Sequence, residues 1–303
     1  PAGHIWKFVT LAYIPPTIAG VVLAYRKKYL LGGVITALFI ALQIQSNHIQ
    51  MSYYFMFVIL FFIIAYFVDA YEKKELPHFF KASAILALAA VVGVCVNISN
   101  LYHTYEYSKE TMRGKSELKQ EGPAANQTSS GLDRDYITNW SYGIGETLTL
   151  LVPNVKGGGC STTLSQNETA MAKANPMYGN LYSQLTPYFG DQPWTAGPVY
   201  VGAFVVFLFI LGCFIVKGPL KWALLGATIF SILLSWGKNF MGLTDFFIDY
   251  IPMYNKFRAV SSILVIAEFT IPLLAIFALK EILSKPDILK LKENRTGVIV
   301  TLV

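Results

Sequence analysis

The most regular feature of the sequence is a series of long apolar stretches separated by short polar ones. Seven of them approach the length of about 20 residues that a helix needs to cross a hydrocarbon core of about 30 Å, and an eighth begins at residue 296. The runs are continuous and do not alternate with a period of two, so they indicate helices and not barrel strands. The predicted spans are residues 5–24, 30–45, 49–68, 79–98, 197–216, 222–236 and 259–279.

The composition favours a membrane location over a soluble one. Hydrophobic residues make up 54% of the 303 residues and charged residues 14%, whereas soluble domains carry about 25% charge. The mean hydropathy is +0.48, and the 15% of aromatic residues excludes a disordered chain. We therefore predict an all-α integral membrane protein. It would be a polytopic helical bundle with about seven complete transmembrane helices, a truncated eighth and one long outer-face segment.

The net charge of +6 indicates orientation and not binding to nucleic acid. If the loop at 25–29 is cytoplasmic, 13 of the 24 lysines and arginines lie on the inner side, where basic loop residues accumulate. Lys238, Lys256 and Arg258 then occupy the short outer loops, and the segment 99–196 is on the outer side.

This topology divides the chain into three blocks. Within the middle block, the polar stretch 113–131 predicts a solvated loop, and the aromatic stretch 136–155 predicts packing on the bundle or in the membrane interface. Because the chain begins at Pro1 without methionine and ends in a fresh apolar run, we expect an internal part of a longer protein. The blocks are four helices in 1–98, the outer segment 99–196, and three helices plus the start of another in 197–303.

Unusual polar residues gather on the predicted outer side. Cationic side chains there would suit the phosphate of an anionic or lipid-linked headgroup, and a carboxylate would accept a proton from a hydroxyl. The bland alternatives are an interfacial belt for tyrosine and tryptophan and snorkelling to headgroups for Lys7 and Arg258. The residues predicted to line an outer cleft are His4, Lys7, His48, Gln50, Trp140, Glu146, Asp191 and Arg258.

One full charge lies inside a predicted span. We place Glu268 at the middle of the 259–279 span, and Pro272 four residues later should kink the helix. Such a carboxylate marks a proton or ion site, or else a protonated carboxyl bonded to a neighbouring hydroxyl. Pro15 and Pro16 should likewise break the first span.

Several soluble chemistries have no support. The sequence has no phosphate-binding GxxxxGK[ST] and no GxSxG elbow. No cofactor is evident, and the need for a divalent metal stays open. The four histidines lack metal-ligand spacing, and the three cysteines are expected to be packing residues; they are His4, His48, His78 and His103, and Cys95, Cys160 and Cys213.

Five segments resemble the YfhO family of bacterial multi-pass membrane proteins, in particular its long Bacteroidetes members. They are GHIWKFVTLAYIPP, SNHIQMSYYF, LDRDYITNWSYGIGETLTLLVPN, YFGDQPWTAGPVYVGA and YNKFRAVSS, and WSYGIGETLTLLVPN is the most specific. That family is similar to GT-C glycosyltransferases, which take sugars from polyprenyl-phosphate donors. The resemblance implies a GT-C-like fold in the bacterial inner (cytoplasmic) membrane, with 99–196 in the periplasm. It also implies a catalytic carboxylate in the first outer loop, before Pro1, so the catalytic residue is unknown.

The leading hypothesis is therefore sugar transfer from a polyprenyl-phosphate donor to a surface glycan or lipid acceptor. In it, Lys7 and Arg258 bind phosphate, while Glu146 and Asp191 orient hydroxyls. His48, Gln50 and Trp140 would shape the pocket for sugar and membrane lipid. Two alternatives stay open: a transporter or flippase for lipid-linked substrates, which would use Glu268, and a non-catalytic membrane assembly protein.

Overall fold

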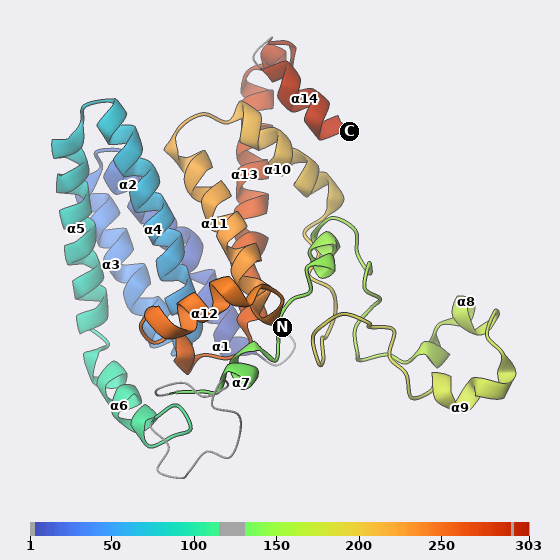
Figure 1. Cartoon of the computed structure of the whole chain (residues 1–303). Coiled ribbons are helices and arrows are strands. Elements are labelled where there is room, and N and C mark those ends of the chain that lie inside the picture. The colour runs from blue at the N-terminus through green and yellow to red at the C-terminus, as the bar shows by residue number, and fades with distance from the viewer. Residues whose placement is uncertain (1–3, 115–130, 292–293, 303) are drawn as a thin grey trace. The chain divides into compact units, whose positions relative to one another are not determined.

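The computed structural model describes residues 4–114, 131–291 and 294–302, and these residues form helices joined by turns and loops (Figure 1). Most of the predicted solvated loop 113–131 lies outside the described residues. The chain folds into two compact units. The first contains α1 to α6 with residues 216–228, and the second contains residues 132–215 and 229–303.

The first unit begins with a broken helix. Helix α1 (Ile5–Ala12) ends one residue before α2 (Ile14–Tyr25), and Pro15 and Pro16 occupy the first turn of α2. Proline is favoured there because the first N–H groups of a helix have no intrahelical partner. The predicted proline break in the first span is confirmed.

Four more helices complete the helical part of the first unit: α3 (Tyr29–Gln45), α4 (Ile49–Glu72), α5 (Leu76–Cys95) and α6 (Ile98–Lys109). Small residues let α2 and α3 approach closely, as in other membrane helix pairs. A Cβ atom added at Gly32 would lie 2.5 Å from the backbone nitrogen of Ala24, and one at Gly20 would lie 2.9 Å from that of Thr36.

The second unit carries the rest of the long segment and the C-terminal helices. Its core includes Tyr142, Leu264 and Ile271, which are buried together. Helix α11 is shared between the units. The elements are α7 (Arg134–Thr138), η2 (Gly145–Leu150), η3 (Leu164–Gln166), α8 (Glu168–Met171), η4 (Pro176–Tyr178), α9 (Gly179–Tyr182), α10 (Ala203–Ile215), α11 (Pro219–Ser235), η5 (Gly237–Phe240), α12 (Met241–Tyr250), η6 (Tyr254–Lys256), η7 (Val260–Leu264), α13 (Val265–Ser284), η8 (Pro286–Lys290) and α14 (Arg295–Leu302).

Each predicted span corresponds to a helix, and several helices are long and apolar enough to cross a membrane. Among the described residues, four meet both conditions, and α11 joins them if it is counted with the 237–250 segment that follows. Helices α3 and α10 are apolar but shorter. The structure thus supports an all-helical membrane protein, whereas seven spans and a GT-C arrangement stay predictions. The four helices are Ile5–Tyr25, Ile49–Glu72, Leu76–Cys95 and Val260–Ser284.

Glu268 lies within the candidate span Val260–Ser284, in the first turn of α13, and its side chain is exposed. Helix η7 forms the first five residues of this span. The role of Glu268 as a proton or ion site stays a prediction. Pro272 lies inside α13, which continues through it.

The α2–α3 approach predicts that Gly32→Ala destabilises the protein. The new Cβ would meet backbone atoms, which cannot rotate away as a side chain can. We expect a loss of about 1–3 kcal/mol, typical of overpacking, measured as thermal unfolding in detergent.

The matched control is Gly242→Ala in α12, where a Cβ meets nothing within 4 Å. This substitution should be neutral or stabilising by up to about 1 kcal/mol, since alanine is the better helix former. Equal melting temperatures for the two variants would contradict the close α2–α3 packing.

Candidate functional site

Glu146, in η2, is a carboxylate that is only 3% exposed. Its Oε2 accepts hydrogen bonds from the backbone N–H groups of Gly143 (2.6 Å) and Asp191 (3.3 Å), and its Oε1 accepts one from the Tyr188 hydroxyl (2.6 Å). A buried charge is costly unless it is hydrogen-bonded, so these three donors compensate for the burial of the Glu146 carboxylate. Glu146 therefore joins the stretch 141–146 to the loop 188–191.

Two glycines allow this close approach. A Cβ added at Gly143 would lie 2.7 Å from Oδ2 of Asp191, and one at Gly190 would collide with Oε1 of Glu146. Real Cβ atoms essentially never come so close to a neighbouring atom, so a side chain at either position would displace the carboxylate or phenol groups that meet here. The motifs WSYGIGE and YFGDQPW are thus two halves of one structure.

Tyr142 attaches the same stretch to the helices. Its side chain is 2% exposed and its hydroxyl is hydrogen-bonded to Thr149, whose hydroxyl donates to the backbone carbonyl of Glu146 at 2.7 Å. Burial raises the pKa of Tyr142 to about 12, so the phenol stays neutral at physiological pH. The backbone N–H of Tyr142 donates to the carbonyl of Ser235, the last residue of α11 (2.8 Å).

Asp191 lies at the surface, and two side chains hold it in position by hydrogen bonds. Lys238 Nζ donates to the Asp191 carbonyl at 3.1 Å, and Asn239 Nδ2 donates to the carboxylate Oδ2 at 3.0 Å. The same Asn239 amide donates to the carbonyl of Tyr142 at 3.0 Å. The Asp191 carboxylate is therefore exposed but held in one place.

Arg258 lies beside a group of aromatic rings. Its guanidinium carbon is 5.4 Å from the ring centre of Tyr136 and 5.9 Å from that of Trp140, and Nη1 donates to the Tyr136 hydroxyl at 2.7 Å. Trp140 Nε1 in turn donates to the carbonyl of Trp194 at 3.2 Å. Cation and rings thus form one exposed surface.

Ser261 links this surface to the loop that carries Asp191. Its backbone N–H donates to the Trp140 carbonyl (3.0 Å), and its hydroxyl donates to Oε1 of Gln192 (3.2 Å). Four of the predicted site residues are therefore connected in the second unit. We call the connected set the Glu146 network; it comprises Trp140, Glu146, Tyr188, Asp191, Gln192, Lys238, Asn239, Arg258 and Ser261.

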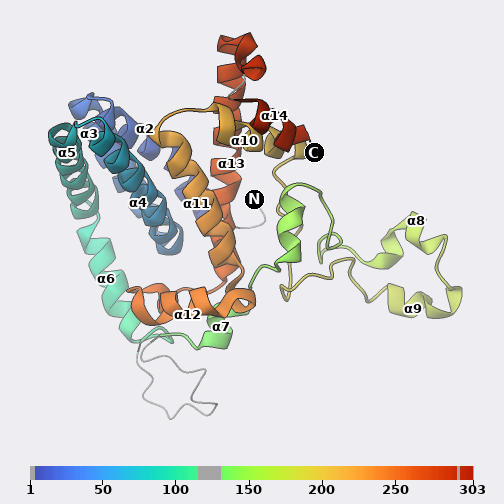
Figure 2. The same cartoon turned by 45° about the horizontal axis from the view of Figure 1, so that its top comes forward.

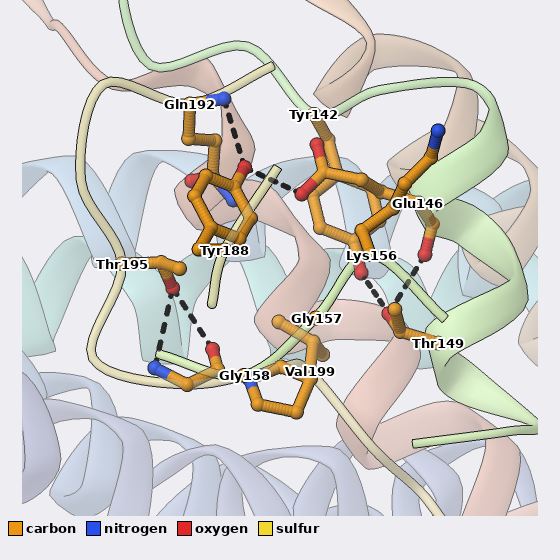
Figure 3. A pocket seen from close by; sticks show the side chains of 12 residues that line it. Tyr142, Glu146, Thr149, Lys156, Gly157, Gly158, Tyr188, Gln192, Thr195 and Val199 are labelled. Carbon is orange, nitrogen blue, oxygen red and sulfur yellow. Dashed lines mark hydrogen bonds between the residues drawn. The ribbon is translucent and has the colours of Figure 1, made fainter. Parts of the chain in front are cut away.

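A pocket opens beside Glu146 (Figure 3), with about 240 Å³ of atom-free space that includes space open to solvent. Tyr188 lines it, and burial together with the hydrogen bond to Glu146 raises the pKa of this phenol, which stays a hydrogen-bond donor. Lys156 adds a cation to the lining. The other lining residues are Tyr142, Thr149, Gly157, Gly158, Gln192, Thr195, Gly197, Pro198 and Val199.

The remaining predicted site residues lie in the first unit. His48 precedes α4, and the charges of Lys7 and His4 both act on it. Gln50 Nε2 donates to the hydroxyl of Tyr54 at 3.0 Å. The structure thus forms two groups of predicted residues, one in each unit, and the single outer cleft stays a prediction.

Sequence reasoning missed several residues of the site. Tyr188 and Asn239 lie in short loops whose other polar residues gave no sign of their partners, and Lys156 precedes a glycine run that has the pattern of a flexible turn. Their partners are far away in the sequence, so no local spacing indicates them. A tyrosine two residues before the GDQPW motif is the one available signal.

Among the residues that the structure describes, no group of three histidine, cysteine or acidic side chains could hold a metal ion. No protein-family model, curated protein or solved structure matches the chain. The resemblance to the YfhO family and to GT-C enzymes therefore stays a prediction.

The geometry of Glu146 predicts that Tyr188→Phe destabilises the second unit. The change removes the hydrogen bond from a buried carboxylate oxygen, which costs about 1–3 kcal/mol. Thermal unfolding measures it, and Tyr178→Phe, at an exposed tyrosine of the same segment, is the control. Equal melting temperatures would show that Glu146 does not depend on this phenol.

The first unit should lose stability in acid through His48. Burial, and then the charge of Lys7, lower the pKa of His48 below its ordinary value of 6.5. Because the folded-state pKa is the lower one, stability is full above about pH 6.5 and is lost as the pH falls through the folded pKa. Melting temperatures recorded between about pH 7.5 and pH 5 should fall less in His48→Gln than in the unchanged chain. His103→Gln, which leaves His48 in place, should keep the full acid dependence.

Proposed function

We propose that the chain belongs to a membrane protein that transfers a sugar from a polyprenyl-phosphate donor to a surface glycan or lipid acceptor. In this proposal the protein lies in the bacterial inner membrane, with the segment 99–196 on the outer side. The apolar helices support the membrane location. The excess of basic residues in the loops assigned to the inner side supports the orientation.

One observation carries the proposal: three stretches far apart in the sequence bring an arginine, aromatic rings and an exposed carboxylate into one network. Arg258 offers a planar guanidinium that suits phosphate oxygens. Trp140 and Trp194 offer ring faces to a sugar, and Asp191 offers an acceptor for its hydroxyls. These are the groups that a phosphate-linked sugar requires.

The structure changes the role that we assign to Glu146. Both of its carboxylate oxygens already accept hydrogen bonds from the protein. We therefore treat Glu146 as a positioning residue that holds the loop of Asp191, and not as a group that binds substrate.

The reaction itself requires a base that the proposal leaves unassigned. An acceptor hydroxyl oxygen would form the new bond to the anomeric carbon of the sugar, and its proton would pass to a carboxylate. The bond from that carbon to the phosphate oxygen would break, and polyprenyl phosphate would leave. Arg258 would stabilise the phosphate as its charge increases.

The test is substitution of Arg258 in the full protein, expressed in a strain that lacks the gene. Hydrogen bonds to a charged group contribute about 1.5–3 kcal/mol, so Arg258→Gln should reduce transfer about 10-fold to 100-fold. The measurement is accumulation of the lipid-linked sugar with loss of the glycosylated product. Lys173→Gln removes an exposed cation from the segment 99–196 and should leave transfer unchanged.

A second candidate function is transport or flipping of a lipid-linked substrate, favoured by the exposed Glu268 carboxylate within a candidate span. Under that function Glu268→Gln abolishes movement across the membrane, while Arg258→Gln has the smaller effect. If neither substitution changes the lipid-linked pools, the protein is a non-catalytic assembly protein and both proposals fail.

A further inference from the structure

Helix α12 (Met241–Tyr250) is not expected from the sequence, which places a loop between two spans there. The structure forms η5 and α12 there, and the segment of the two, Gly237–Tyr250, is bent by 107° from α11. Figure 2 shows α12 running crosswise to α13, the next long helix of the same unit. Helix α12 therefore lies across the direction of α13.

The surface of α12 has three different edges. The first is buried and contains Thr244, Phe247 and Ile248. The second carries two carboxylates one turn apart, Asp245 and Asp249. The third presents aromatic side chains to the outside: Phe246 is 50% exposed and Tyr250 is 74% exposed, with ring centres 5.5 Å apart.

A single arginine binds both carboxylates of the acidic edge. Arg134, at the start of α7, donates from Nη1 to Asp245 at 2.7 Å and from Nη2 to Asp249 at 2.6 Å. The arginine side chain is 18% exposed and the two carboxylates are 43% exposed. The acidic edge is therefore joined to the segment 132–140 through Arg134 and stays partly exposed, and the aromatic edge is left open.

Length and charge argue against α12 as half of a broken span. The 17 residues of α11 already extend about 25 Å, close to the hydrocarbon thickness of about 30 Å. The ten residues of α12 would add about 15 Å, which is more than one span requires. If α12 continued α11 into the bilayer, two carboxylates and a guanidinium would enter hydrocarbon, where each ionised group costs several kcal/mol. A helix with charges on one edge and aromatic rings on another suits the interface instead.

We propose that α12 is an interfacial helix, which lies in the plane of the membrane surface with Phe246 and Tyr250 inserted at the boundary between headgroups and acyl chains. Tyrosine is enriched at this depth. Arg134 then fixes the segment 132–140, and with it Trp140, at headgroup level. The inference holds whether or not the protein transfers sugar.

Site-directed spin labelling of the full chain tests this position. The chain, with its three native cysteines replaced by alanine, is reconstituted in vesicles of phosphatidylcholine and phosphatidylglycerol. Nitroxides are attached in Phe246→Cys and, independently, in Tyr250→Cys. The control is Asp245→Cys, on the acidic edge of the same helix, where Asp249 keeps its ion pair with Arg134. Collision with oxygen, which dissolves in lipid, is compared with collision with a water-soluble nickel complex.

We expect labels at 246 and 250 to favour oxygen and to lie at the same depth, while the label at 245 favours nickel. A depth that increases steadily from 245 to 250 would make α12 part of a broken span and overturn the proposal. Equal nickel access at all three positions would place the helix in water, and protection from both reagents at 246 and 250 would mean that protein covers the aromatic edge. Either result also contradicts the proposal.

Discussion

The second unit depends on one buried carboxylate. Glu146 has lost its contact with water, and a charge in that position is tolerated only if donors surround it. The donors come from two loops more than 40 residues apart, Gly143 on one side and Tyr188 with Asp191 on the other. Because each loop satisfies the same carboxylate, neither can take this conformation alone.

This constraint explains how a largely irregular segment presents an ordered surface. Asp191 is exposed, yet three neighbours hold it through its backbone and its carboxylate. Arg258 and Trp140 join the same structure through Ser261. The residues proposed to meet substrate are thus positioned by others that do not. On the other side of the segment, Arg134 ties α7 to α12, which would keep this surface close to the membrane.

Hydropathy was sufficient to predict where the long helices lie, because a continuous apolar run has few other uses in a membrane protein. It did not predict α12, whose acidic residues become tolerable only once Arg134 arrives from elsewhere in the chain. It placed Glu268 within a span, and the structure puts this residue in the first turn of α13. The sequence analysis grouped Trp140, Asp191 and Arg258 because the predicted topology assigns their loops to the same side of the membrane. The roles of Tyr188 and Asn239 could not be predicted from the sequence, because both depend on hydrogen bonds to residues of distant loops.

The central claim is that Glu146 holds the loop 188–194 in place, and hydrogen exchange tests it most directly. In Glu146→Gln, the buried side chain keeps its size and loses its charge, so the N–H of Asp191 and the phenol of Tyr188 lose their charged acceptor. Mass spectrometry should then find faster amide exchange in peptides covering 188–194, with no change in peptides covering α8 and α9. Unchanged exchange in 188–194 would contradict the account.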